Sequence, residues 1–187
     1  MSNYNPVTPA FIDKLRAIVG AEFVFTDGET LDKYKTDEET SGLLQKELSE
    51  LQNQLGYTDV TGTGIIITIK EDGIDDDRIN YEDLLYIVNA LKGAGAEAIS
   101  INDQRIVGTT DIVDIQSSYI KINGKRILAP YTIKAIGNQS YLESALIGNG
   151  GYVDELKKYG FDIEIERNNK VMILKSTKDT SLRYIET

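Results

Sequence analysis

The sequence contains neither cysteine nor histidine among its 187 residues. Without cysteine the chain forms no disulfide and offers no thiolate nucleophile. Without either residue type it has no Cys/His zinc site and no histidine-dependent catalytic triad. Basic residues are also outnumbered, because 20 Lys and Arg face 30 Asp and Glu, which gives a formal net charge of −10. Such a charge repels nucleic acid and anionic membrane surfaces, so we expect neither as a partner.

Long apolar runs are absent as well. No stretch approaches the ~18 residues of a membrane-spanning helix, and no secretion signal opens the chain, so the chain as given is expected to be soluble. The composition is otherwise that of a globular protein, with 41% hydrophobic and 27% charged residues. This length suits one domain with a core and an appended segment.

Short helices are predicted at the start of the chain. Thr8-Pro9 is typical of an N-cap followed by proline in the first helical turn, and apolar residues then recur at helical spacing. A second short helix is expected over residues 29–34. Residues 35–42 are polar and mark the predicted end of a helical N-terminal segment, residues 1–40.

The next segment, residues 41–56, has leucines at heptad spacing with Gln, Lys and Glu between them. This pattern predicts an amphipathic helix. It covers about two heptads, fewer than the three to four on which a coiled-coil prediction usually rests. Two interpretations therefore stay open, a helix docked on its own domain and a self-associating stalk. In the second, the partner surface is formed by Leu44, Leu48, Leu51 and Leu55.

Residues 57–187 are predicted to form an α/β domain of the α+β kind. Residues 65–69 have the length and β-branching of a buried strand, and residues 98–101 form the next strand. Between them, Asn80 can cap a helix that has Asp83 at the capping-box position. A strand–helix–strand crossover of this length predicts one parallel, right-handed βαβ unit. Its facing stripes are expected to pack together in the core: Ile65, Ile67, Leu84, Val88, Ile99 and Ile101.

The second half of the chain changes to antiparallel hairpins. Asn123-Gly124 is typical of a type I′ turn between two strands. Asn168-Asn169 is expected to turn the chain again, into a second hairpin. One βαβ unit followed by hairpins predicts a mixed sheet with helices packed on it, preceded by the amphipathic helix.

Few patterns indicate a chemical site. Gly62-Thr63-Gly64 precedes a strand rather than a helix, so it is expected to be a tight entry turn and not a phosphate loop. The acidic run at residues 71–77 lacks the ligand spacing of a calcium loop, which favours a solvated loop over a weak cation site. Five carboxylates are considered as members of an acid/base pair: Asp103, Asp111, Asp114, Glu143 and Glu155. No two of them have a spacing that selects them, so the protein is predicted not to be an enzyme.

One polar cluster is a candidate ligand-binding site. Asn102, Gln104 and Arg105 follow a predicted buried strand, and such a cluster either binds a small ligand or ties down neighbouring loops. Tyr131 is either a core aromatic or a stacking platform. If the protein binds a small ligand, we expect a groove near Arg105 and Tyr131 to hold it. No metal site, cofactor or catalytic residue is predicted.

Four stretches of sequence resemble one bacterial family. They are VTGTGIIITI at 60–69, EDLLYIVNALKGAGAEAISINDQRI at 82–106, APYTIKAIG at 129–137 and GGYVDELKKYGFDIEIE at 150–166. Together they are similar to the domain of unknown function 881 family, the YlxW/YlxX-like proteins, over about residues 40–187. The resemblance implies a membrane-anchored, extracytoplasmic parent protein with a coiled coil, linked to the cell envelope or division. It implies no site, because the family has no established catalytic residue.

The first part of the chain resembles a different family. Residues 8–39, TPAFIDKLRAIVGAEFVFTDGETLDKYKTDEE, are similar to the N-terminal lead-in of FAD-linked oxidases of the glycolate oxidase D-subunit type. That stretch ends before any glycine-rich turn able to hold a pyrophosphate, so we expect no flavin cofactor. The leading hypothesis is therefore a non-catalytic interaction or scaffold domain. The alternatives are a small-ligand-binding module and a fragment related to FAD-linked oxidoreductases.

Overall fold

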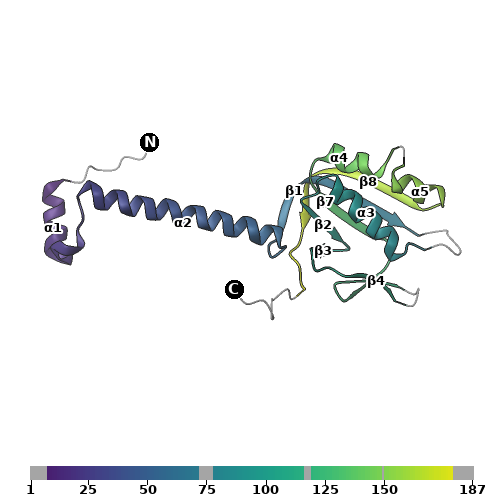
Figure 1. Cartoon of the computed structure of the whole chain (residues 1–187), viewed down its shortest axis with the longest axis horizontal. Helices are drawn as coiled ribbons and strands as arrows, with labels where there is room; N and C mark the ends of the chain where they lie inside the picture. Colours follow the sequence, from purple (N-terminus) through teal and green to yellow (C-terminus); the bar gives the residue numbers. More distant parts are fainter. Residues whose placement is uncertain (1–7, 72–77, 116–118, 149, 179–187) are drawn as a thin grey trace. The chain divides into compact units, whose positions relative to one another are not determined.

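The structure is a computed structural model, and its course is drawn in Figure 1. The residues it describes are 8–71, 78–115, 119–148 and 150–178. The chain divides into two compact units, Met1–Ser49 and Glu50–Thr187, and each is described by itself.

The described chain forms both helices and strands, and the strands within residues 98–136 follow one another without a helix between them. The helical elements are α1 (Pro9–Val19), the 3₁₀ turn η1 (Ala21–Phe23), α2 (Gly28–Gln54), α3 (Tyr81–Gly93), α4 (Gln139–Leu146) and α5 (Tyr152–Lys158). The strands are β1 (Val60–Lys70), β2 (Ala98–Ile101), β3 (Gln104–Ile106), β4 (Ile112–Ile115), β5 (Tyr119–Ile122), β6 (Lys125–Ile127), β7 (Tyr131–Ile136) and β8 (Asp162–Ile173). They form a five-stranded sheet, β3-β2-β7-β1-β8, and a three-stranded sheet, β4-β5-β6.

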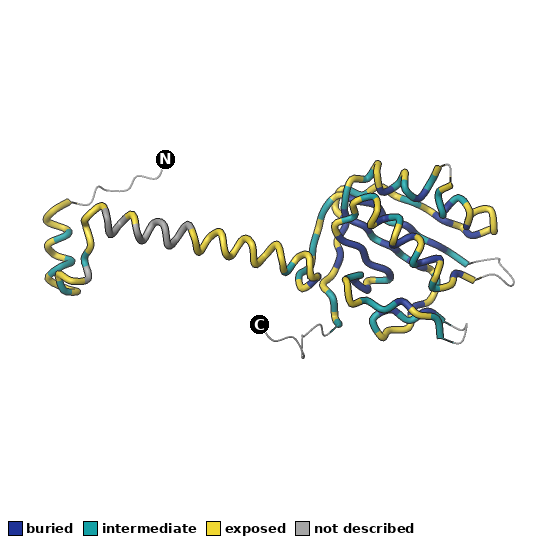
Figure 2. The backbone as a smooth tube through the Cα atoms, in the orientation of Figure 1, coloured by how far each residue is buried: buried dark blue, intermediate teal, exposed yellow. Residues whose placement is uncertain are grey.

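Helix α1 begins as its sequence predicts but buries nothing. Thr8 is the N-cap, its Oγ1 accepts a hydrogen bond from the Phe11 N–H, and Pro9 occupies the first turn. Gly20 ends the helix with a φ of 97°, a conformation that favours glycine. No residue of α1 is buried, as the colours along the tube in Figure 2 show.

Helix α2 is one continuous element. It runs through residues 35–42, where the polar composition predicts a break between two shorter helices. The Lys and Glu residues of this stretch have good helix propensity, so its polar composition is compatible with an exposed helix as well as with a linker. No described helix combines the length and the apolar character needed to cross a bilayer.

The predicted α+β class is confirmed in the second unit. Strands β1 and β2 run in the same direction, on either side of α3 in sequence, but β7 lies between them and pairs antiparallel with both. The βαβ unit is therefore split, and every hydrogen-bonded pair in the main sheet is antiparallel. This arrangement differs from the predicted mixed sheet, because a strand distant in sequence is inserted at its centre.

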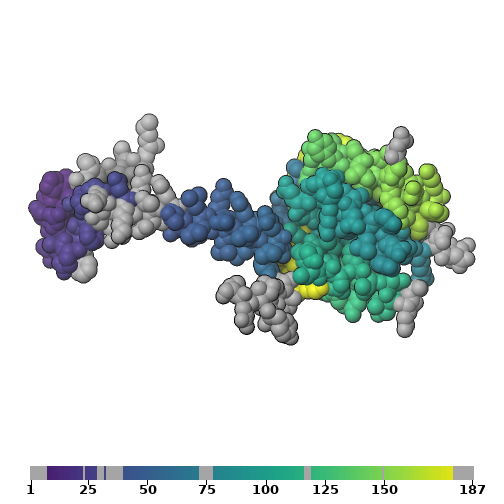
Figure 3. Space-filling view, viewed as in Figure 1, coloured from purple at the N-terminus to yellow at the C-terminus, as the bar shows by residue number. Residues whose placement is uncertain are grey.

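Helices α3, α4 and α5 cover one face of the main sheet (Figure 1), and their side chains close over it in the space-filling view (Figure 3). All six residues predicted for the core are buried there in one cluster. Ile65 and Ile67 of β1 and Leu84 of α3 have no exposed surface. The second sheet joins the same core through Ile120 and Ile122, which are also buried.

The turn between β5 and β6 is confirmed, because Asn123 and Gly124 have φ angles of 50° and 79°. The turn predicted at Asn168-Asn169 is wrong. Strand β8 continues through it, and these residues lie where the register along β1 shifts. The pair is a β-bulge, to which polar residues are as well suited as to a turn.

The bulge changes which face β8 presents. Gly64 pairs with Asn168, whereas Gly62 pairs with Val171, so β8 holds one extra residue. Side chains alternate along a strand, and one extra residue reverses that alternation. Consequently Ile163 packs in the helix-covered core, and Val171 and Ile173 join a smaller apolar cluster on the opposite face.

Gly62 and Gly64 also lie inside β1 rather than in an entry turn, which corrects the prediction for this tripeptide. A Cβ at Gly64 would lie 1.9 Å from the carbonyl oxygen of Ala135 on β7. Glycine is therefore required at position 64 by the close approach of β1 and β7.

Candidate functional site

The four predicted ligand residues do not share one groove. Asn102 lies in the turn between β2 and β3 with a φ of 43°. Its Nδ2 donates to the carbonyl oxygens of Leu128 and Pro130 at 3.0 and 3.2 Å, and its Oδ1 accepts from the Thr132 N–H at 2.7 Å. Asn102 thus ties this turn to the start of β7, which is the loop-binding role that the sequence left open.

Tyr131 and Gln104 are buried and lie apart from each other. Gln104 opposes Ile101 in the sheet register. Tyr131 forms part of the wall of a hollow of about 370 Å³ together with Arg78 and Asp114. Burial raises the pKa of the Tyr131 hydroxyl to about 12, so the phenol stays neutral at physiological pH.

Arg105 is the residue around which a site is built. It lies on β3 opposite Ser100, and only 3% of its surface is exposed. Its Nη2 donates to the carbonyl oxygen of Asn53 at 3.2 Å. Asn53 belongs to the last turn of α2, where carbonyl groups lack partners within the helix and carry partial negative charge. The guanidinium therefore caps the end of this helix.

Gly56 allows the chain to pass close to Arg105 after the helix ends. It has a φ of 76°, and a Cβ there would lie 2.6 Å from Val107 Cγ1 and 3.4 Å from Arg105 Cγ. Any other residue would therefore be strained at this position and would collide with Val107. The requirement fixes how the last turn of α2 meets β3.

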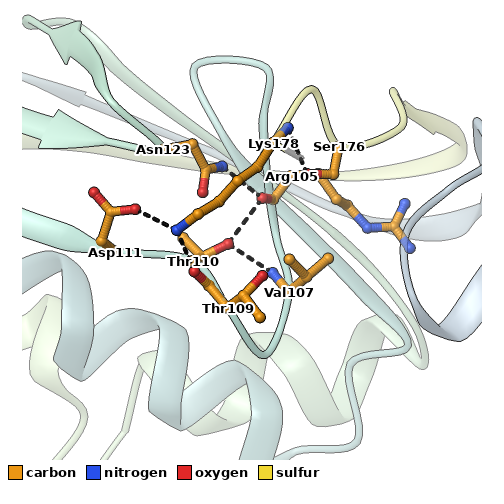
Figure 4. Close-up of polar contacts among 8 residues, drawn as sticks. All are labelled: Arg105, Val107, Thr109, Thr110, Asp111, Asn123, Ser176 and Lys178. Carbon is orange, nitrogen blue, oxygen red and sulfur yellow. Dashed lines mark hydrogen bonds and ion pairs between the residues drawn. The ribbon is translucent and has the colours of Figure 1, made fainter. Parts of the chain in front are cut away.

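The backbone of Arg105 is held as firmly as its side chain (Figure 4). Its carbonyl oxygen accepts hydrogen bonds from Thr110 Oγ1 at 3.2 Å and from Asn123 Nδ2 at 3.0 Å. Thr110 Oγ1 in turn accepts from the Val107 N–H at 2.9 Å. We call Arg105, Asn53, Gly56, Thr110 and Asn123 the Arg105 junction.

The C-terminal segment joins the same region. Lys178 Nζ contacts Asp111 Oδ1 at 2.6 Å and the carbonyl oxygen of Thr109 (Figure 4). The hydrogen bond from Lys178 lowers the pKa of the Asp111 carboxyl. The Ser176 N–H donates to the carbonyl oxygen of Gly56 at 2.8 Å. The end of the described chain is thereby attached beside the end of α2.

A hollow of about 560 Å³ opens beside the Arg105 junction. Its apolar wall belongs to the smaller apolar cluster, on the face of the main sheet opposite the helices, and its rim is polar. The wall is formed by Val60, Ala98 and Ile136, and the rim includes Glu50, Gln54 and Glu97. Charged and apolar groups thus converge on one space of a size common for small-molecule sites.

Three buried side-chain atoms among the described residues have no hydrogen-bond partner, and all belong to Arg105 or to residues next to it. They are Ser100 Oγ, Arg105 Nη1 and Asn123 Oδ1. Ser100 opposes Arg105 across the strand pair, and Asn123 binds its carbonyl oxygen. Buried polar atoms are normally paired, so this concentration calls for a physical explanation.

The carboxylates considered from the sequence are largely paired with cations. Asp103 binds Lys134 at 2.7 Å, and Glu143 binds Arg167 at 2.5 Å. Within the described part of the chain, no three Asp or Glu residues group as metal ligands. Of the acidic run, residues 72–77 lie outside the described residues. Glu71, which precedes them, accepts a hydrogen bond from the Ile79 N–H at 2.9 Å.

Known proteins resemble the chain over most of its length. A family model described as "Bacterial protein of unknown function (DUF881)" matches residues 47–186. A UPF0749 protein of Mycobacterium tuberculosis is 31% identical over 140 residues, which are 73% of this chain and 47% of that protein. The UPF0749 protein YlxX of Bacillus subtilis is 30% identical over 140 residues, 71% of this chain and 59% of its own.

A solved structure shares the fold. The crystal structure of an uncharacterized conserved protein from Mycobacterium tuberculosis has a TM-score of 0.65 and 28% sequence identity, and the match covers 75% of this chain and 99% of that one. The chain spans about half the length of the mycobacterial relatives it matches, 47% in each case. None of these names assigns an activity or a ligand.

Proposed function

Because the chain belongs to the bacterial DUF881 family, as its sequence resemblance predicts, and the family description assigns no function, we propose one from the geometry of the chain itself. The protein is a non-catalytic module that self-associates through α2 and offers its α+β unit to other proteins. The family resemblance supports a place at the cell envelope, in a longer protein that carries an anchor.

The exposed leucine stripe, defined as Leu44, Leu48 and Leu51 of α2 with Leu55 directly after its end, carries this proposal. These side chains are 60%, 55%, 50% and 54% exposed. No other part of the described chain covers them. A continuous apolar row left half in water is typical of a surface that a partner covers.

A second copy of α2 fits this stripe. The leucines are spaced four, three and four residues apart, which places them at the a and d positions of heptads. In a parallel pair, Glu47 then lies against Gln52 of the second copy, so no like charges meet at the seam. The stripe is only about two heptads long, and we therefore expect weak association.

Two observations support a role without catalysis. The sequence has no histidine or cysteine to act as a base or nucleophile near neutral pH. Three of its candidate carboxylates, Asp103, Asp111 and Glu143, are in ion pairs with Lys or Arg, which favours a structural role. The family match begins at residue 47, so it lends nothing to the oxidase-fragment alternative.

Sedimentation equilibrium of the full chain tests the proposal. We expect a concentration-dependent monomer–dimer equilibrium with a dissociation constant between about 10 μM and 1 mM. Leu48→Glu should abolish the dimer because it places a charge in the seam. Ser49→Glu, one residue away and off the stripe, should leave the dimer intact. A parent chain that stays monomeric at about 1 mM would refute self-association through the stripe.

A further inference from the structure

Arg105 is a buried cation without an anion. Its Nη1 has no hydrogen-bond partner, and its Nη2 binds a neutral carbonyl group. None of the ion pairs of the described chain includes it. Burial lowers the pKa of the guanidinium, which shows that its surroundings disfavour the charge. A buried charge is normally paired, so Arg105 lacks one partner, and the natural partner of a guanidinium is a carboxylate.

The other unpartnered atoms adjoin the same residue. Ser100 Oγ lies on the same face of the sheet as Arg105, on the neighbouring strand, in a residue that is 1% exposed. Asn123 Oδ1 belongs to the side chain that binds the Arg105 carbonyl. An arginine that served only as a helix cap would explain its bond to Asn53. It would not explain a second guanidinium nitrogen without a partner beside a hydroxyl group without one.

The hollow next to Arg105 supplies the remaining chemistry. Val60, Ala98 and Ile136 offer an apolar wall, and two carboxylates, Glu50 and Glu97, lie at the rim. Both glutamates are exposed, and neither side chain forms a hydrogen bond or an ion pair within the described chain. The two negative charges at the rim oppose a plain anion. They favour a guest that also carries a positive charge.

We propose that this hollow binds a small zwitterion, a molecule with a carboxylate and an amine on a short apolar body, such as a free dipeptide. The ligand carboxylate accepts hydrogen bonds from Arg105, its ammonium group lies between Glu50 and Glu97, and its apolar part packs on Ile136. Arg105 lines the hollow but its Nη1 is buried, so binding requires the side chains around the guanidinium to shift. The site lies within residues 50–187 and does not depend on the leucine stripe.

The first experiment compares three matched probes by ¹H–¹⁵N NMR titration of the labelled full chain. The probes are the dipeptide Ala-Leu, its C-terminal amide and its N-acetyl derivative. Saturable shifts with Ala-Leu should be confined to the lining of the hollow. Loss of the carboxylate or of the ammonium charge should each weaken binding at least about tenfold. Equal affinity for all three probes, or no saturable shift up to about 20 mM Ala-Leu, would overturn the proposal.

The second experiment uses variants of the chain. Arg105→Gln should weaken Ala-Leu binding at least about tenfold, and Glu97→Gln should weaken it several-fold while leaving the N-acetyl probe unaffected. Val60→Trp enlarges a half-buried side chain of the apolar wall, so it should fill the hollow and abolish binding even if Arg105→Gln does not fold. Glu166→Gln, an exposed change on β8 outside the hollow, is the matched control. Retained affinity in Val60→Trp would place the ligand elsewhere and refute the site.

Discussion

The N-terminal unit and the α+β unit use similar apolar residues in opposite ways. In the first, Phe11 is 51% and Ile18 79% exposed, and α1 buries no side chain. In the second, Ile65 and Leu84 are completely buried. Isolated helices of this length are marginal in water, since most helical stability in proteins comes from packing. The α+β unit therefore has a buried core that stabilises it, whereas α1 buries no residue that could stabilise it in the same way.

An aspartate placed on an apolar position of each unit should test this contrast most clearly. Val88→Asp places a charge where the native side chain is 2% exposed, and we expect a loss of about 3–5 kcal/mol in the free energy of unfolding. Ile18→Asp, at a position that is 79% exposed, should change it by less than about 0.5 kcal/mol. Denaturant unfolding followed by circular dichroism measures both. A Val88→Asp protein as stable as the parent would contradict the core described above.

Close packing within the α+β unit predicts the next largest effect. Gly64→Ala places a Cβ 1.9 Å from the Ala135 carbonyl oxygen and forces β1 and β7 apart, so we expect a loss of about 2–3 kcal/mol. Gly93→Ala is the control, because no atom lies within 4 Å of the new Cβ. Its better helix propensity should raise stability by up to about 1 kcal/mol. Thermal melting distinguishes the two, and equal melting temperatures would refute the close approach at Gly64.

A smaller effect is expected where α5 is hydrogen-bonded to α3. The Tyr152 hydroxyl donates to Asp83 Oδ1 at 2.5 Å, and burial followed by this bond raises the pKa of the tyrosine. Tyr152→Phe keeps the ring contact with Tyr86 but leaves the buried Asp83 short of a donor, at a cost of about 1–2 kcal/mol. Tyr159→Phe alters a side chain that is 69% exposed and should have no measurable effect. If both variants melt alike, the hydrogen bond adds nothing.

The smallest effect belongs to the ion pair of Lys178 and Asp111, which is partly exposed. Because Lys178 holds the folded pKa of Asp111 below its ordinary value of 3.8, the pair stabilises the fold above that pH. The stabilisation disappears as the pH falls through the lowered pKa. Lys178→Met should therefore cost less than about 1 kcal/mol at pH 7, and the difference from the parent should shrink below pH 3.8. Lys175→Met is the control, and a difference that is independent of pH would exclude this ion pair as its cause.

Local sequence patterns predicted the local structure well. Asn80 and Asp83 form the predicted capping box, and the bond from the Asn80 N–H to Asp83 Oδ2 is 2.7 Å long. Asn123-Gly124 forms the predicted turn. In both cases the residues that interact are neighbours in sequence, so their chemistry alone decides the outcome.

The sequence did not predict which segments distant along the chain pair with each other. Strand β7 lies between β1 and β2, and the hydrophobic pattern of a strand does not indicate which other strand it pairs with. The polar pair Asn168-Asn169 suits a bulge as well as a turn. The site shows the same limit. Arg105 was a candidate, but its partner Asn53 lies 52 positions earlier in the chain, and Lys178 lies 67 positions after Asp111. Nothing in the spacing of these residues indicates that they meet.

The antiparallel pairing of β1 with β8 has a mechanical consequence. The first residue of β1, Val60, pairs with the last residue of β8, Ile173, so the chain enters and leaves this sheet at one corner. A pulling force applied to the chain on both sides of that corner would break the hydrogen bonds between β1 and β8 one after another, which is unzipping. It would not load all of them at once, as shear does. Such a geometry yields at low force. Two contacts are made by residues that follow β8, and they must then break first. They are the hydrogen bond from the Ser176 N–H to the Gly56 carbonyl oxygen and the ion pair of Lys178 with Asp111.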